Sequence, residues 1–192
     1  RLALPEHQIA PDDVEALTIE MGVDEELVLQ GGSGDFQGQF LCYAPPFFNS
    51  EQGLANRVKH LLGTPTAVDA ERVDRWIDRF TQKVGLQLSE QQRQAVMMAA
   101  RHRVLILTGG PGTGKSFTCK TIVALWRAMG KSIALASPTG RAAQRLSEMT
   151  GQEAKTVHRT LEFDPKTMKF KRDQDNPIPV DAIVVDESSM LD

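Results

Sequence analysis

The sequence predicts an α/β fold over residues 86–192, a parallel sheet with helices on its faces, preceded by a smaller α+β and helical region. Three observations support this prediction. From residue 86 onward, short apolar runs alternate with helical patterns, as in βαβ units. These runs are almost continuously apolar, which is typical of strands covered on both sides. A glycine-rich segment, residues 109–116, separates one such run from the helix that follows it.

Residues 1–48 predict a helix followed by a hairpin. Residues 11–21 begin with a proline and two acidic residues, a typical helix start. Residues 26–29 and 40–43 are strand-like and flank a glycine-rich turn. A helix followed by a hairpin is similar to part of a winged-helix unit. A small α+β connector without a binding role explains the pattern equally well.

Residues 49–85 predict a helical accessory region. Residues 50–62 begin with a capping serine and carry apolar residues at helical spacing. Residues 69–84 also repeat apolar side chains at helical intervals, which indicates a stripe buried in the core. The members of that stripe are Val73, Trp76, Ile77, Phe80 and Val84.

The part from residue 86 is expected to alternate helix and strand three times. The predicted helices are residues 89–100, 116–129 and 140–149, and the predicted strands are residues 104–108, 132–136 and 182–185. Because each strand is followed by a helix or a long connection, the strands are expected to run parallel.

The composition, with 41% hydrophobic and 24% charged residues, is ordinary for a globular protein. No apolar stretch approaches the ~20 residues that span a bilayer, and the N-terminal region is acidic rather than signal-like. We therefore expect a cytoplasmic protein without membrane contact, with Cys42 and Cys119 reduced and in the core. Residues 1–85 carry a net charge of −7 and residues 86–192 one of +4, so only the second part suits a polyanion.

Residues 109–116, GGPGTGKS, match the phosphate-binding loop pattern of two glycines separated by four residues, then lysine and a hydroxyl residue. Such glycines let backbone N–H groups surround an anion, and the start of the next helix adds positive charge. A chance glycine turn is the alternative, but a strand before the loop and a helix after it favour a P-loop NTPase sheet. The residues expected to contact ATP are Gly110, Pro111, Gly112, Thr113, Gly114, Lys115, Ser116 and Phe117.

Two residues of this loop are expected to do chemistry. Lys115 would bridge the outer phosphates, and Ser116 would place its hydroxyl on Mg²⁺. A second apolar run ends in the paired acids Asp186 and Glu187, which completes a site of this kind. Asp186 would hold Mg²⁺ through water, and Glu187 would orient and deprotonate the attacking water. The sequence therefore predicts ATP and Mg²⁺ as cofactors.

Five segments of the chain, in the order that the family shows, resemble motifs of the RecD-like DNA helicases of superfamily 1. Residues 88–96 are similar to the family's glutamine motif, in which Gln92 would contact the adenine edge. Residues 109–116 match its nucleotide loop, and the strand before Asp186 matches its acidic motif. The two remaining segments, residues 137–146 and residues 154–161, resemble its single-strand contact motifs.

The resemblance implies DNA contacts at Pro138, Thr139, Gly140, Arg141, Thr156 and His158. The position of the first four supports this role, because a strand-end turn leading into a helix exposes N–H groups, a hydroxyl and a guanidinium to phosphates. The alternatives are an ordinary helix cap at Thr139 and a structural histidine at His158.

Residues 161–173 predict a short hairpin, in which two phenylalanines flank an Asp-Pro-Lys-Thr turn. The hairpin is similar to the pin that RecD-like helicases insert here to split the duplex. Lys169 and Lys171, on its second arm, would attract backbone phosphate. An ordinary surface hairpin is the alternative.

The resemblance implies a RecA-like first motor domain that is incomplete, since the later helicase motifs lie outside these residues. The chain begins at Arg1 without methionine and stops at Asp192 soon after an apolar run, so we expect a longer parent protein. That parent would unwind DNA in the 5′–3′ direction in recombination or repair. Its partners would be single-stranded and duplex DNA, its own second motor domain and other recombination subunits.

Two other classes of protein remain open. One is a phosphate-loop kinase or non-translocating ATPase, which would have an acceptor site in place of the strand-contact segments. The other is a DNA-binding module without ATP turnover. DNA-stimulated ATP hydrolysis distinguishes the helicase from both.

Overall fold

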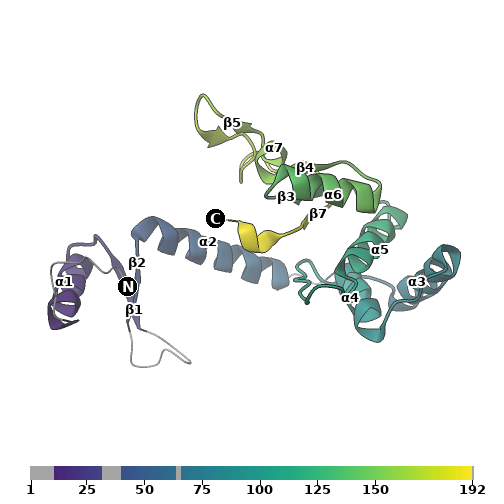
Figure 1. Ribbon diagram of the computed structural model, residues 1–192, viewed down its shortest axis with the longest axis horizontal. Coiled ribbons are helices and arrows are strands. Elements are labelled where there is room, and N and C mark those ends of the chain that lie inside the picture. Colours follow the sequence, from purple (N-terminus) through teal and green to yellow (C-terminus); the bar gives the residue numbers. More distant parts are fainter. Residues whose placement is uncertain (1–10, 32–39, 64–65, 192) are drawn as a thin grey trace. The chain divides into compact units, whose positions relative to one another are not determined.

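The computed structural model describes residues 11–31, 40–63 and 66–191 (Figure 1). The chain divides into two compact units, residues 1–63 and residues 64–192. The helix before residue 63 belongs to the first unit, and the helix after it belongs to the second. The division into residues 1–48, 49–85 and 86–192 and the winged-helix likeness stay predictions.

The first unit contains the predicted helix and hairpin. Helix α1 (Pro11–Val23) is followed by strands β1 (Val28–Gly31) and β2 (Phe40–Tyr43), which pair antiparallel. Strand β1 begins two residues later than the predicted residues 26–29. The predicted turn between the strands lies largely outside the described residues.

Helix α2 (Pro45–Leu62) begins five residues before the predicted start. The prediction placed the start at Ser50 as a capping residue, after the two prolines. A proline at the first helical position costs nothing, because its missing N–H would have no helical partner there. Pro45 and Pro46 therefore open the helix, and the hydroxyl of Ser50 donates to the carbonyl oxygen of Pro46 (2.8 Å) instead of capping.

Three helices of the second unit agree with the sequence within one residue: α3 (Ala70–Val84), α4 (Glu90–Arg101) and α5 (Lys115–Ala128). Local signals explain this agreement. Asp69 caps α3 by accepting from the backbone N–H of Arg72 (3.0 Å), and Gly85 ends it in the left-handed conformation (φ 69°).

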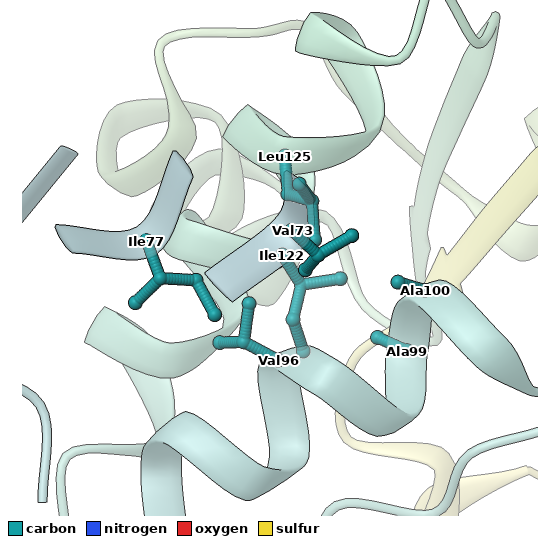
Figure 2. Packing of buried hydrophobic residues seen from close by; sticks show 7 residues of the cluster. All are labelled: Val73, Ile77, Val96, Ala99, Ala100, Ile122 and Leu125. Atoms are coloured by element: carbon teal, nitrogen blue, oxygen red, sulfur yellow. The ribbon is translucent and has the colours of Figure 1, made fainter. Parts of the chain in front are cut away.

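The three helices pack together around one hydrophobic core, which Figure 2 shows from close by. Trp126 of α5 adds a polar link, since its indole N–H donates to the carbonyl oxygen of Ala99 (3.1 Å). Of the predicted α3 stripe, Val73 and Ile77 are buried, whereas Val84 is exposed. The core residues are Val73, Ile77, Val96, Ala99, Ala100, Ile122 and Leu125.

A parallel sheet confirms the predicted α/β class. Its strands are β3 (Ile133–Ser137), β4 (Ala154–Thr156) and β7 (Ala182–Val185), in the order β4-β3-β7. Helix α6 (Gly140–Thr150) connects β3 to β4. Val123 of α5, Leu135 of β3 and Leu146 of α6 form a second core cluster, which holds the two helices against the sheet. The sequence predicted neither β4 nor the short helix α7 (Val157–Thr160) after it.

The predicted strand at residues 104–108 is wrong. These residues have no regular structure and pair with none of the described strands. Leu105 packs against the core of α3, α4 and α5, but the Ile106 side chain is 79% exposed. An apolar, β-branched run favours an extended chain, whereas a strand also requires a neighbouring strand to complete its hydrogen bonds.

The predicted hairpin at residues 161–173 is present. Strands β5 (Phe163–Asp164) and β6 (Lys169–Phe170) pair antiparallel, and the Asp164 carboxylate accepts from the backbone N–H of Lys166 in the turn (2.9 Å). A single 3₁₀ turn, η2 (Ser188–Met190), follows the sheet. Among the described helices, none combines the length and apolarity required to cross a membrane.

Candidate nucleotide-binding site

The glycine loop enters helix α5 through two left-handed residues. Gly112 has φ 75° and Gly114 has φ 78°, conformations that residues with a Cβ adopt only with strain. Gly114 is the N-cap, so α5 begins directly at Lys115. The first backbone N–H groups of a helix have no partner within it and carry partial positive charge. The loop therefore leads into a helix start suited to phosphate.

The side chain of Lys115 folds back into the loop. Its ammonium group donates to the carbonyl oxygens of Gly109 and Gly110, the latter at 2.7 Å. The hydroxyl of Thr113 also donates to the carbonyl oxygen of Gly110 (2.9 Å). The amine is thus held within the loop by neutral acceptors, which bind it less strongly than an anionic phosphate would.

Gln92 is connected to the same loop. Its side-chain oxygen accepts from the backbone N–H of Ser89 (2.9 Å), which completes a capping box at the start of α4. Its side-chain N–H donates to the carbonyl oxygen of Thr113 (3.0 Å). A Cβ at Gly114 would collide with this amide. Gln92 therefore links α4 to the phosphate loop, while its contact with adenine stays a prediction.

Substitution Gln92→Ala is expected to weaken ATP and GTP binding by the same factor, about 5–10-fold. The change removes the hydrogen bond to Thr113, and a net hydrogen bond contributes roughly 1 kcal/mol. Equilibrium titration with both nucleotides measures the factor, and Gln94→Ala in the same helix serves as the control. A loss confined to ATP would contradict the loop role and support adenine contact instead.

The acidic pair follows strand β7 at the carboxyl end of the sheet. The backbone N–H of Asp186 donates to the carbonyl oxygen of Ala136 (3.0 Å), and the hydroxyl of Ser137 donates to that of Asp186 (3.4 Å). Glu187 has φ 54°, a left-handed conformation that is strained for a residue with a side chain. Glu25, Glu162 and Met168 also adopt left-handed conformations, so Glu187 is a functional candidate because it follows β7 and Asp186, not because of its backbone alone.

The thiol of Cys119 shows that Asp186 lies near α5. Burial, and to a lesser extent the negative charge of Asp186, raise the pKa of Cys119 to about 11. Cys119 lies one helical turn after Lys115 and Ser116, on the same side of α5 as Lys115. The carboxylate is therefore close to the helix that begins with the loop. Cys42, also expected in the core, is exposed instead.

Residues 137–146, the first segment predicted to contact single-stranded DNA, follow strand β3. Thr139 caps α6 by accepting from the backbone N–H of Ala142 (3.2 Å), Pro138 is half-buried, and Gly140 and Arg141 are exposed. Thr139 thus performs the structural role of a cap, with the exposed guanidinium two residues later.

The second segment follows β4. Thr156 caps α7 by accepting from the backbone N–H of Arg159 (3.3 Å), and it lies beside Ser137 in the sheet register. Since β3, β4 and β7 are parallel, their last residues all lie at one edge. The sheet therefore brings Thr156, Thr139 and Asp186 to the same edge.

His158 contacts the hairpin. Its ring lies 5.3 Å from that of Phe163 in a T-shaped arrangement and 5.7 Å from that of Phe170. Lys169 and Lys171 are exposed on the second arm. His158 therefore has a structural role in the hairpin, and its contact with DNA stays a prediction.

The sequence did not predict the ion pair that closes the base of the hairpin. The guanidinium of Arg172 lies 2.7 Å from the Glu162 carboxylate and also donates to the side-chain oxygen of Asn176 (3.2 Å). The basic residues after the hairpin offered a weak signal for it. Arg172 and Glu162 are ten positions apart and meet only when the hairpin closes, so the sequence alone does not show that they pair.

Comparison with known proteins identifies the family. The model of a family described as an AAA domain matches residues 92–192. The chain is 41% identical over 154 residues to the ATP-dependent RecD2 DNA helicase of Deinococcus radiodurans, which covers 80% of this chain and 21% of that protein. The chain belongs to the RecD-like DNA helicases.

Other RecD-like proteins match a shorter part of the chain. The RecBCD enzyme subunit RecD of Mycolicibacterium smegmatis is 40% identical over 126 residues, which is 53% of this chain and 23% of that protein. The corresponding subunit of Mycobacterium tuberculosis is 38% identical over 125 residues, 53% of this chain and 22% of that protein. The chain thus spans about a fifth of the length of these RecD-like relatives.

Proposed function

We propose that this chain forms the ATP-binding part of an ATP-driven DNA helicase. The observation that supports the proposal best is the shared edge of the sheet. The acidic pair follows β7 at this edge, and the two predicted DNA-contact segments follow β3 and β4 there. In addition, the charge of Asp186 acts on Cys119 of α5. In a helicase, ATP hydrolysis must change the contacts with DNA, which requires the ATP-binding site and the DNA-binding residues to lie on common structural elements.

In this proposal, the glycine loop binds the phosphates of ATP. Lys115 leaves its two carbonyl partners and donates to the outer phosphates, while Ser116 and Asp186 hold Mg²⁺. Glu187 accepts a proton from the attacking water. When bound, ATP supplies the phosphoryl group, and Mg²⁺ neutralises the charge that develops on it.

DNA is the proposed nucleic acid along which the parent protein moves. Backbone N–H groups at the start of α6, with Arg141 and Thr156, would hold phosphates without reading the base sequence. The hairpin would part the duplex, with Lys169 and Lys171 attracting the backbone. Movement in the 5′–3′ direction, a role in recombination or repair, cytoplasmic location and a second motor domain are further parts of the proposal.

The names of the relatives support this assignment over a kinase or a simple ATPase. One is an ATP-dependent DNA helicase, and two are subunits of the RecBCD enzyme. A parent protein that acts alone and one that acts as a subunit of a larger enzyme are both compatible with these names.

ATP hydrolysis by the full-length protein is expected to rise at least tenfold when single-stranded DNA is added. The reason is that the residues proposed to contact DNA and the acidic pair proposed to act in hydrolysis lie at the same edge of the sheet. Duplexes with a 5′ or a 3′ overhang then test direction, and only the 5′ overhang should permit unwinding. Hydrolysis that DNA leaves unchanged would contradict the helicase and support a non-translocating enzyme.

A further inference from the structure

Helix α3 carries a row of three arginines on one side. Arg72, Arg75 and Arg79 are spaced three and four residues apart, so they follow the same face of the helix. At 1.5 Å per residue, the row extends over about 10 Å. All three residues are exposed. The row is therefore a compact positive surface within the otherwise acidic residues 1–85.

The three guanidinium groups have no partner among the described residues, to judge by the hydrogen bonds and ion pairs there. Two of the three carboxylates of the same helix are engaged elsewhere, and the third, Glu71 in its first turn, is exposed. Asp74 and Asp78 lie 2.6 and 2.7 Å from the guanidinium of Arg93 on α4. Asp74 and Asp78 thus share the guanidinium of Arg93, whereas the three arginines of the row are left for an external anion.

The row lines a groove of about 650 Å³ between α3 and the end of α5. Trp76 forms part of its wall, with its ring stacked on that of Phe80 at a centroid distance of 4.9 Å. Leu125 and Ala128 of α5 also line the groove. Asp69 also lines the groove, but its carboxylate accepts the backbone N–H of Arg72 as the helix cap.

We propose that the arginine row of α3 binds the phosphate backbone of DNA. Charge complementarity decides the occupant, since three unpaired guanidinium groups match phosphate oxygens in both geometry and charge. The site is separate from the predicted strand contacts, which lie at the carboxyl edge of the sheet. The inference rests on the proposed function only in taking DNA as the polyanion.

The test is the salt dependence of DNA binding by the full-length protein, without nucleotide. Each phosphate contact contributes about 0.7 to the slope of log K against log salt for single strands. The triple variant R72Q/R75Q/R79Q is expected to reduce that slope by about 2, and each single variant by about 0.7. In arginine-modification footprinting, DNA is expected to protect these three residues.

A matched control changes the charge equally at exposed arginines of the same unit. The triple variant R101Q/R103Q/R127Q is expected to leave the slope unchanged. An equal fall in both triple variants would mean a general charge effect and would overturn the proposal. So would an unchanged slope in the α3 variant.

Two comparisons separate failure of this proposal from failure of the helicase assignment. The α3 variant is measured again in the Lys115→Ala background, where its effect on the slope should be the same. If the unmodified protein binds DNA and hydrolyses ATP in response, but the α3 slope is unchanged, only the arginine row is refuted. If the unmodified protein does not bind DNA, the helicase assignment fails as well.

Discussion

Substitution Lys115→Ala in the full-length protein is expected to lower the rate of ATP turnover by a factor on the order of 10²–10³. The ammonium group already lies in the loop, where it donates to the carbonyl oxygens of Gly109 and Gly110. A bound phosphate would take over these bonds, so alanine removes a positive charge where negative charge develops during phosphoryl transfer. Steady-state hydrolysis with saturating single-stranded DNA measures the effect.

Two further variants make this result specific. Lys120→Ala removes an exposed lysine of the same helix and should leave turnover within about twofold, because no loop contact depends on it. Glu187→Gln should abolish turnover but retain ATP binding, because it removes the base and keeps the loop. Retention of DNA-stimulated turnover in Lys115→Ala would refute the assignment of this loop as the catalytic site.

Local signals explain what the sequence predicted well. The ends of α3 and α4 are determined by Asp69, Gly85 and Ser89, each of which acts within three or four residues of the helix end. The phosphate loop was found for the same reason, since its pattern is contiguous. A property that depends on neighbours in the sequence can be predicted from the sequence alone.

Apart from the start of α2, where the local proline signal was missed, the errors and omissions concern partners distant in the chain. Residues 104–108 have the composition of a strand, yet a strand is completed by a neighbour that composition does not specify. The bond of Gln92 to Thr113 joins residues 21 positions apart, and that of Arg93 to Asp74 joins residues 19 positions apart. In both hydrogen bonds the sequence shows that the side chain can donate, but only the tertiary packing determines which acceptor it reaches.

Backbone strain was equally hidden from the sequence. Glu187 adopts φ 54°, and a left-handed residue with a side chain costs roughly 1–2 kcal/mol. Glycine, and to a lesser extent Asn and Asp, signal this conformation in a sequence, whereas Glu gives no sign of it. Glu187 lies between strand β7 and the 3₁₀ turn at residues 188–190, so its conformation depends on how these two elements are joined.

Substitution Phe163→Ala is expected to reduce duplex unwinding about tenfold while DNA-stimulated ATP hydrolysis stays within about twofold. The strands of the hairpin are only two residues long, so its rigidity depends on side chains. Phe163 contacts both His158 (5.3 Å) and Phe170 (5.2 Å). Each aromatic pair contributes about 0.5–1.5 kcal/mol, and loss of two such pairs is enough for a factor of ten.

Because the same histidine follows Thr156 at the sheet edge, this aromatic cluster connects the strand contacts to the hairpin. The Phe163→Ala variant should therefore hydrolyse ATP without separating the DNA strands. The measured quantity is the number of base pairs unwound per ATP hydrolysed. Met168→Ala, at the exposed turn of the hairpin, is the matched control and should keep that ratio. An equal fall of unwinding and hydrolysis in Phe163→Ala would place the cluster in the ATPase cycle itself and contradict a separate role in strand separation.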